Sequence, residues 1–508
     1  MSCQADEFKN CPGLHIGSKI RGKIQNGKTP TCSAPRRQAG PFGIVAASES
    51  WLRAIVPNPS LAVLVANHTT SNRQSKQTAA REETMRYSNP DRRTILKTMT
   101  SLAAASSMAK ITVGRAEAAT ASDPALSPAL GDVDQALRQA VNARTVPGVV
   151  AIAATDKGIV YEGAFGHSIT ADSVFWIASM TKAITGAACM QLVEQGKLQL
   201  DQPMGKLLPQ LEQPKVLEGF DASGAPKLRP AKRAITLRHL LTHTAGFTYS
   251  IWSEPMTQFE KVTGTPFVGE CKNATFNAPL MFDPGDRWEY GINMDWVGKA
   301  VEAVSDQSLE VYFKEKIFAP LGMTDTGFLI SSSQKARVAP MFSRQGDGSL
   351  KPMDFEMPQR PEFFMGGGAL FSTPRNYMAF LQMLLHEGTF NGAQVLKPET
   401  VALMRQNHMG DLNVVTLKTV NPESSNDANL FPGMTQKWGL SFDINTEPGP
   451  AGRSAGSLAW AGLFNTYFWL DPNKRVTGTI MTQLLPFADD QVLKLFAKFE
   501  SGLYAAVA

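Results

Sequence analysis

Strand-like segments stand near both ends of the body of this chain. Residues 149–153 and 158–165 flank a Thr-Asp-Lys turn, and residues 464–470 and 476–482 flank an Asp-Pro-Asn turn. Each pair is a hairpin signal, because two β-forming runs are separated by turn-forming residues. The sequence therefore predicts an α/β (α+β) fold, with one antiparallel sheet built from both chain ends.

Helical patterns at about 130–144 and 488–505 adjoin the two hairpins, so we expect helices to flank the sheet. The segment between the hairpins is long, helical and rich in loops. We expect an α/β lobe at about 125–200 and 366–508, and an inserted, mostly helical lobe at about 201–365. A cleft between two such lobes is the expected substrate site.

The N-terminal part differs from this body. Residues 1–84 consist of short pieces rich in Gly, Ser, Pro, Arg and Gln, and their one apolar run is too short to build a core. Such a composition is typical of disorder. We expect residues 1–84 to be a disordered or non-native upstream segment, with Met85 as an alternative start.

Residues 85–118 have a basic start, an Ala-rich middle and small residues at the end, which is the pattern of a secretory signal peptide. Arg92 and Arg93 resemble the twin-arginine export signal. The alternative is an ordinary amphipathic helix. We therefore expect the twin-arginine machinery to export the precursor to the periplasm or out of the cell, leaving residues 119–508 as the mature chain.

Charge and composition exclude several classes of partner. Residues 120–508 carry 33 Lys and Arg against 38 Asp and Glu, so the basic excess lies in the N-terminal segments. A nucleic-acid-binding face needs clustered basic residues on the folded part, so nucleic acid is not an expected partner. No run reaches the ~18 apolar residues of a transmembrane helix, and five cysteines are too few for a disulfide scaffold.

The most informative local motif is Ser179-x-x-Lys182, at the start of an apolar helical pattern. Residues three apart share a helix face, so the Lys182 amine can reach the Ser179 hydroxyl. A neighbouring amine can activate a serine, which is a weak nucleophile by itself. The spacing alone also fits a solvated lysine beside a helix cap. A second copy, Ser332-x-x-Lys335, has no apolar helix behind it, so we do not expect a site there.

Two later segments follow this motif along the chain. Tyr290 comes after a Pro-Gly turn and before a helix-like run, and Trp460 and Gly462 lie in a small-residue segment that leads into a strand. Together with the S-x-x-K motif, these segments resemble those of serine hydrolases with the class C β-lactamase fold, in the β-lactamase/transpeptidase-like superfamily. The resemblance is closest to the family VIII carboxylesterases, and it runs from Asp132 to near the C-terminus.

The resemblance implies that Ser179 is the nucleophile and that Lys182 and Tyr290 share the general-base work. An unperturbed tyrosine is a poor base at neutral pH, because its pKa is near 10. A lysine beside the phenol would favour the phenolate, and the two groups would then titrate as a pair.

The remaining implied roles concern the acyl group. The backbone N–H groups of Ser179 and Leu463 would form the oxyanion hole. Trp460 and Gly462 would hold the strand edge against the acyl group. The resemblance implies neither a metal ion nor a cofactor.

The sequence departs from the β-lactamase pattern in two places. Trp460 stands where that class carries the Lys of Lys-Thr-Gly, which removes the cation for a β-lactam carboxylate. Gly291 follows Tyr290 where the esterases often have Ser, and Asn293 lies one place later than the Asn of Tyr-x-Asn. Efficient β-lactam hydrolysis is therefore not expected.

Three competing motifs have weaker support. Ser454 lies in a Gly-x-Ser-x-Gly pattern, but neither the strand before it nor the helix after it that a nucleophile elbow needs is indicated. His239 and His243 have zinc-like spacing without the Glu or a third ligand, so packing roles are expected. Ser424-x-Asn426 imitates a β-lactamase element inside a polar loop.

The expected activity is hydrolysis of small carboxylic esters through an acyl-enzyme, with a small-molecule ester or short peptide as substrate. Several alternatives remain open. They are a peptide or amide hydrolase, such as a D-peptidase or a hydrolase of linearised cyclic peptides, an acyltransferase, a weak β-lactamase and, outside enzymes, a penicillin-recognising sensor.

Overall fold

The computed structural model describes residues 127–508. The expectations for residues 1–84 and for the export signal at 85–118 lie outside the described residues and stay predictions.

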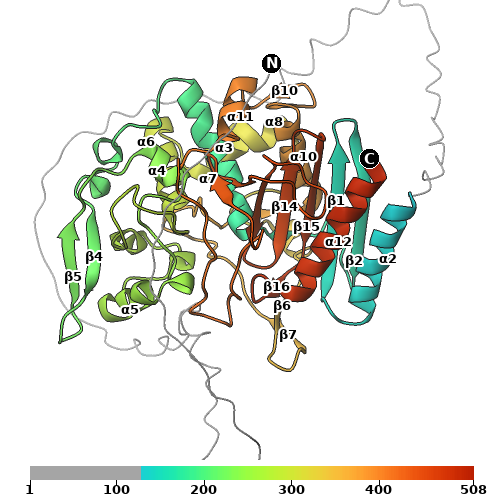
Figure 1. Cartoon of the computed structure of the whole chain (residues 1–508), viewed down its shortest axis with the longest axis horizontal. Helices are drawn as coiled ribbons and strands as arrows, with labels where there is room; N and C mark the ends of the chain where they lie inside the picture. Colours follow the sequence, from blue (N-terminus) through green and yellow to red (C-terminus); the bar gives the residue numbers. More distant parts are fainter. Residues whose placement is uncertain (1–126) are drawn as a thin grey trace, which may run out of the picture. The chain divides into compact units, whose positions relative to one another are not determined.

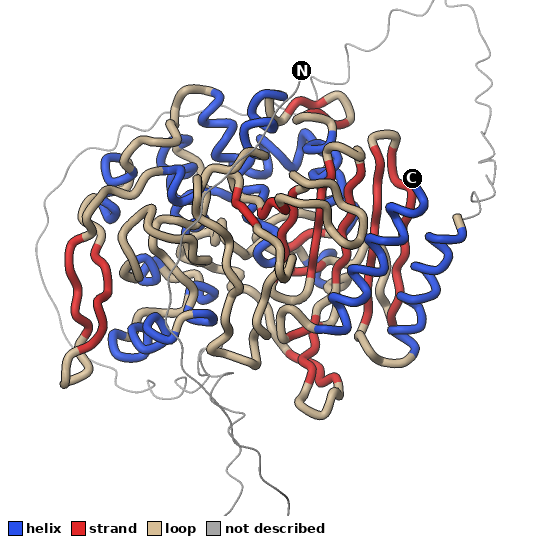
Figure 2. The backbone as a smooth tube through the Cα atoms, viewed as in Figure 1, coloured by secondary structure: helices blue, strands red, loops and turns tan. Residues whose placement is uncertain are grey.

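A seven-stranded antiparallel sheet forms the centre of the described chain, with the strand order β11-β12-β13-β14-β15-β1-β2 (Figures 1 and 2). Its strands are β1 (Gly148–Thr155), β2 (Gly158–Gly166), β11 (Gln436–Trp438), β12 (Asp443–Asn445), β13 (Leu458–Gly462), β14 (Thr466–Asp471) and β15 (Val476–Met481). The N-terminal hairpin joins the C-terminal one along β1 and β15, where Val150 lies opposite Met481. The predicted fold class, with a sheet built from both chain ends, is confirmed.

Helices cover both faces of this sheet. The adjacent side chains of β14 show this, because neighbouring residues of a strand point to opposite faces. Tyr467 and Trp469 pack against Phe496 of α12 (Asp490–Val507), whereas Phe468 packs against Tyr377 of α10 (Pro374–Leu385). The expected flanking helices correspond to α12 and α2 (Pro128–Asn142).

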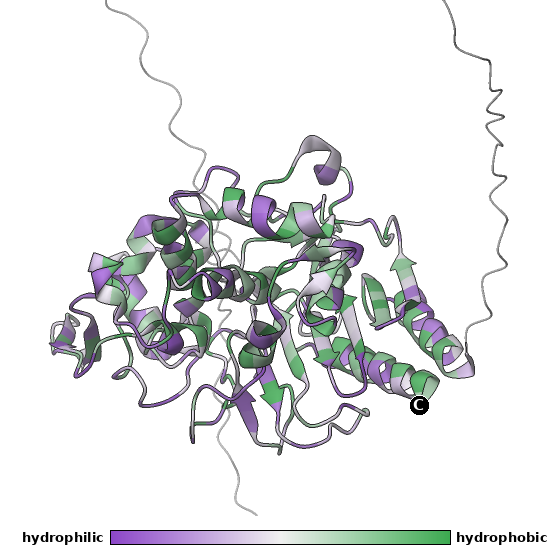
Figure 3. Ribbon diagram, turned by 90° about the horizontal axis from the view of Figure 1, so that it is seen from above, coloured by the Kyte–Doolittle hydropathy of each residue, from purple (hydrophilic) through white to green (hydrophobic). Residues whose placement is uncertain are grey.

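The helices α2 and α12 each present one apolar face to the fold. Buried leucines and a valine recur along α2 at helical spacing, and hydrophobic and hydrophilic bands alternate along both helices in Figure 3. Such helices are stabilised mainly by packing against their neighbours.

The helix α3 (Thr181–Glu194) is different, because every residue from Thr181 to Leu192 is buried. It packs against α6 (Asn293–Ser305). A helix surrounded by protein on all sides gives its first turn a fixed position, and that turn carries Lys182 and follows directly on the turn that carries Ser179.

The segment at 201–365 contains the expected helices and also two hairpins that the sequence did not predict. The hairpins are β4 (Lys215–Phe220) with β5 (Pro226–Pro230), and β6 (Met341–Arg344) with β7 (Leu350–Met353). The helices of the segment are α4 (Leu237–Leu241), α5 (Glu254–Thr263), α6, α7 (Leu309–Phe313), α8 (Ala319–Leu321) and α9 (Ser332–Lys335).

The remaining elements are short connections. They are β3 (Phe175–Trp176), β8 (Phe371–Ser372), β9 (Thr389–Phe390), β10 (Ala393–Gln394), β16 (Leu484–Leu485) and α11 (Pro398–Met404). Of these, β3 pairs with β8, which brings the segment before Ser179 next to the glycine-rich segment at 366–368. No helix among residues 127–508 is long and apolar enough to cross a membrane.

Candidate active site

Ser179 lies in a 3₁₀ turn, Ala178–Met180, that leads directly into α3. Ala178, just before it, has a φ of 43°, a conformation that costs energy for a residue with a Cβ. The turn leaves Ser179 partly exposed in a cavity while its neighbours are buried. The local backbone therefore presents the Ser179 hydroxyl at a helix start.

The Lys182 amine is fully buried and contacts three oxygens. Its Nζ lies 3.0 Å from Ser179 Oγ, 3.0 Å from the Tyr249 hydroxyl and 2.6 Å from the Gly367 carbonyl. Burial lowers the pKa of Lys182, because a charged amine is costly in a dry interior, and the negative charge of Asp295 partly offsets this.

These three contacts determine what a neutral Lys182 amine can do. A neutral amine has two N–H donors and one lone pair. The Gly367 carbonyl can only accept a hydrogen bond, and the Tyr249 hydroxyl can accept the second. The lone pair is then free to point at Ser179, so the geometry suits removal of the serine proton.

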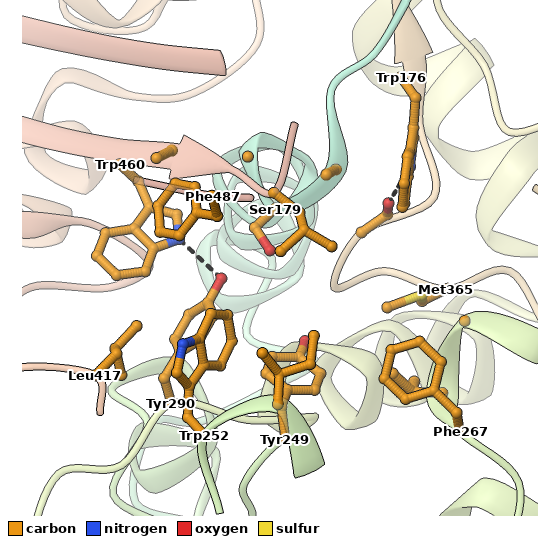
Figure 4. A pocket seen from close by; sticks show the side chains of 18 residues that line it. Trp176, Ser179, Tyr249, Trp252, Phe267, Tyr290, Met365, Leu417, Trp460 and Phe487 are labelled. Atoms are coloured by element: carbon orange, nitrogen blue, oxygen red, sulfur yellow. Dashed lines mark hydrogen bonds between the residues drawn. The ribbon is translucent and has the colours of Figure 1, made fainter. Parts of the chain in front are cut away.

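The Tyr290 phenol lies beside Ser179 and points toward Trp460 (Figure 4). Trp460 Nε1 donates to the Tyr290 hydroxyl over 2.8 Å. Burial raises the pKa of Tyr290, and the neighbouring Ser179 and Trp460 side chains lower it only in part. The phenol is therefore neutral at ordinary pH and can act as a proton donor.

The relation between Lys182 and Tyr290 differs from the sequence expectation. Lys182 Nζ lies 4.6 Å from the centroid of the Tyr290 ring, and the hydroxyl that it bonds is that of Tyr249. Tyr249 follows the His-Thr-Ala-Gly-Phe-Thr segment, where no motif spacing marks it. Tyr249 and Lys182 are 67 positions apart, so only the folded chain brings the two side chains into contact.

The edge of β13 forms another wall of the site. Gly462 has no room for a side chain, because a Cβ would lie 2.3 Å from the Ile177 carbonyl oxygen. Among residues 127–508, no backbone carbonyl accepts from the N–H groups of Ser179 or Leu463. Both expected oxyanion-hole donors therefore remain available.

The cavity in front of Ser179 has a volume of about 610 Å³, including its open mouth. None of its lining side chains is charged, and its hydroxyl groups come from Ser179, Tyr249 and Tyr290. Figure 4 shows the apolar side chains that face it, namely Trp176, Trp252, Phe267, Met365, Leu417 and Phe487. Such a cavity suits an uncharged, largely apolar ligand.

The structure gives a steric reason for Gly291 and a structural role for Asn293, the two departures next to Tyr290. A Cβ on Gly291 would lie 2.4 Å from the Phe247 carbonyl oxygen, so serine does not fit there. Asn293 is buried and contacts His243 Nδ1 and the Phe247 carbonyl oxygen through Nδ2. Asn293 therefore fixes neighbouring loops and does not line the cavity.

The two histidines have packing positions. His239 completes the capping box of Thr236, and His243 is fully buried with its ring centroid 4.7 Å from that of Tyr290. In the described part of the chain, no group of three or more His, Cys, Asp or Glu is arranged to hold a metal ion.

The competing serines lie outside the cavity. Ser332 and Lys335 lie in a single helical turn, α9, and Lys335 pairs with Glu356 at the surface. The backbone N–H of Ser454 bonds Asp471.

The Ser424-x-Asn426 segment has a structural role. The Ser424 carbonyl accepts from the Phe487 N–H, and the Asn426 N–H donates to the Phe487 carbonyl. Since Phe487 lines the cavity, this loop supports the cavity wall without contributing a group to it.

Comparison with known proteins agrees with this geometry. The family described as Beta-lactamase matches residues 133–501. The chain belongs to the beta-lactamase family. The superfamily expected from the three motifs is therefore confirmed.

Two curated relatives carry different activities in their names. Monacolin J acid methylbutanoyltransferase from Aspergillus terreus is 32% identical, with 77% of this chain and 98% of that protein covered. Lovastatin esterase from Penicillium rubens is 28% identical, with 73% and 98% covered. This chain is an enzyme of the serine hydrolase and acyltransferase group within the family.

A solved structure shares the whole described fold. Simvastatin synthase from Aspergillus terreus superimposes with a TM-score of 0.65 at 31% identity, covering 75% of this chain and 98% of that one.

The position of Tyr249 leads to a prediction. Replacing Tyr249 with Phe removes one hydrogen bond from Lys182, so turnover should fall roughly 10- to 100-fold, as expected for a bond to a charged or reacting group. Ester kcat/KM measures this effect. Tyr161→Phe is the matched control, because the buried Tyr161 hydroxyl has no hydrogen-bond partner among residues 127–508. Equal activity of both variants would exclude a role for the Tyr249 hydroxyl.

Proposed function

We propose that this enzyme cleaves small, uncharged carboxylic esters through an acyl-enzyme on Ser179. The observation that carries the proposal is the 3.0 Å contact between Ser179 Oγ and the buried Lys182 amine, whose other two contacts leave a lone pair for the serine proton. The uncharged cavity in front of Ser179 supports an ester substrate without a carboxylate.

In the acylation step Lys182 takes the proton of Ser179 as Oγ attacks the ester carbonyl. The N–H groups of Ser179 and Leu463 hold the developing oxyanion. The neutral Tyr290 phenol gives its proton to the departing alkoxide, and Trp460 Nε1 stabilises the phenolate that remains. The acyl-enzyme then holds a protonated Lys182 and an ionised Tyr290.

Deacylation restores every proton. An incoming water or alcohol gives its proton to the Tyr290 phenolate as its oxygen attacks the acyl carbon. The departing Ser179 oxygen then recovers its proton from Lys182. In this account Lys182 is the base for acylation and Tyr290 is the base for deacylation.

β-Lactams are expected to be poor substrates. Their carboxylate needs a cation, but no charged side chain from residues 127–508 lines the cavity. The single N–H of the Trp460 indole already donates to the Tyr290 hydroxyl. A poorly paired carboxylate in such a cavity costs a few kcal/mol, which corresponds to roughly two orders of magnitude in rate.

A second candidate function is acyl transfer to an alcohol. Named acyltransferases at 31–32% identity match nearly their whole length to this chain, which favours it. A cavity of about 610 Å³ with apolar walls also has room for an apolar acceptor beside a short acyl group.

The first prediction compares substrates. A butyrate ester should have a kcat/KM at least 100-fold above that of a chromogenic cephalosporin, for the charge reason given above. Ser179→Ala should lose about 10³-fold or more of the ester activity, whereas Ser454→Ala should stay within about threefold. A cephalosporin preference, or an active Ser179→Ala variant, would contradict the proposal.

The second prediction separates hydrolysis from transfer. If water is the main acceptor, adding an apolar alcohol such as hexanol should leave the yield of free butyrate close to the amount of ester consumed. If transfer dominates, hexyl butyrate should form instead and total turnover should rise. Product analysis by gas chromatography measures the partition, and dominant hexyl butyrate would favour the acyltransferase.

A further inference from the structure

Asp295 is a buried carboxylate that the proposed reaction does not use. It lies in the first turn of α6, five residues after Tyr290, and its relative exposure is 1%. Its Oδ1 accepts from the Gly367 N–H over 2.8 Å. Its Oδ2 has no hydrogen-bond partner among residues 127–508. A half-satisfied buried carboxylate is costly, so its presence needs an explanation.

Gly367 connects this carboxylate to the reacting amine. Its N–H is held by Asp295, and its carbonyl oxygen accepts from Lys182 Nζ over 2.6 Å. A Cβ on Gly367 would lie 2.6 Å from Asp295 Oδ2, so a side chain there would push the carboxylate away. The carboxylate therefore fixes the residue whose carbonyl orients Lys182.

The glycine segment is also held from α3. Thr185 Oγ1 donates to the Gly366 carbonyl over 2.6 Å, and the Leu370 N–H donates to Thr181 Oγ1 over 3.2 Å. These bonds keep the segment against the helix that carries Lys182. Asp295 supplies the bond from the opposite side, on α6.

The charges around this site are few. The titratable groups that face Asp295 are Lys182, Lys299, Tyr249, Tyr290 and Cys271, and Lys182 is also faced by His243. Lys299 pairs with Glu302 over 3.1 Å on the same helix. Lys182 is therefore the main positive charge that the buried Asp295 can balance.

We propose that Asp295 is a positioning residue for acyl transfer: it holds Gly367 so that the Lys182 lone pair points at Ser179, and its charge balances the ammonium that forms. This inference rests on the proposed function. The proton moves from Ser179 Oγ to Lys182 Nζ as the new bond from Oγ to the acyl carbon forms. Burial raises the pKa of Asp295 to about 6, so at pH 7 and above the carboxylate is ionised and exchanges no proton in this step.

The charge of Asp295 has a consequence for the pH profile. Activity is lost as pH falls, because protonated Lys182 cannot accept the serine proton. The negative charge of Asp295 raises the pKa of Lys182, whereas burial of the amine lowers it more strongly. Asp295→Asn removes the raising effect, so the acidic limb of kcat/KM should move to lower pH.

The test measures both kcat and kcat/KM for a butyrate ester against pH in the full chain, with thermal unfolding as a check of folding. Asp295→Asn should lower the plateau kcat about tenfold or more, because the new ammonium loses its counter-charge, and it should shift the acidic limb to lower pH. An unchanged limb in a folded variant would overturn the proposal, since a merely structural role lowers kcat or stability without moving the limb.

Asp443→Asn is the matched control. Asp443 is equally buried, and neither of its carboxyl oxygens has a hydrogen-bond partner among residues 127–508, but it does not line the cavity. Burial raises the pKa of Asp443 to about 8, so its replacement removes a buried carboxyl group that is mostly uncharged at neutral pH. Its replacement should leave both limb and plateau unchanged. If Asp443→Asn shifted the acidic limb as much as Asp295→Asn does, replacing any buried carboxyl group would be enough to move the limb. That result would overturn the specific role of Asp295.

A second variant covers the case in which Asp295→Asn does not fold. Gly367→Ala keeps the charge but displaces the glycine and pushes the carboxylate away, so kcat should fall about tenfold and the acidic limb should move to lower pH by less than in Asp295→Asn. Unchanged kcat would overturn the positioning role. If the Ser179→Ala variant instead turned over the ester at the wild-type rate, the proposed function itself would be wrong. Failure of the positioning role and failure of the proposed function therefore give different results.

Discussion

The contact between Ser179 and the buried Lys182 amine is the interaction on which the account of this enzyme depends. An amine buried without an adjacent ion pair is expensive, and the protein lowers that cost by giving Nζ three oxygen contacts. The same contacts orient its lone pair. Stability and reactivity therefore come from one arrangement, in which Tyr249 and Gly367 occupy the N–H groups and Ser179 is left facing the base.

The fold keeps this arrangement dry and rigid. Every residue of α3 from Thr181 to Leu192 is buried, so its first turn, which carries Lys182 and directly follows Ser179, is packed into the core. The sheet brings β13 from the C-terminal part against that turn, and Gly462 allows the close approach. From the middle of the chain, the helix α6 brings Asp295 and the segment just before it brings Tyr290. Three segments distant in sequence thus meet at one serine.

Much of this could be predicted from the sequence, but not all. The hairpins at both chain ends and the S-x-x-K motif are local patterns, so the sheet, the helix start and the pair Ser179 and Lys182 could be predicted from them. Tyr290, Trp460 and Gly462 were named through the family resemblance. Tyr249 and Asp295 were not predicted, because their contacts join positions far apart in sequence. The pairing of Lys182 with the Tyr290 phenol was implied by the family resemblance, whereas the hydroxyl that lies against the Lys182 amine is that of Tyr249.

The most direct test of the central claim is to locate the covalent intermediate. The enzyme is mixed with excess butyrate ester, quenched in acid within the first turnovers and digested, and the peptides are analysed by mass spectrometry. The account predicts a butyryl group on the peptide that contains Ser179, at the hydroxyl of that residue, and none in Ser179→Ala. A butyryl group on another serine, or steady turnover in Ser179→Ala without any adduct, would contradict it.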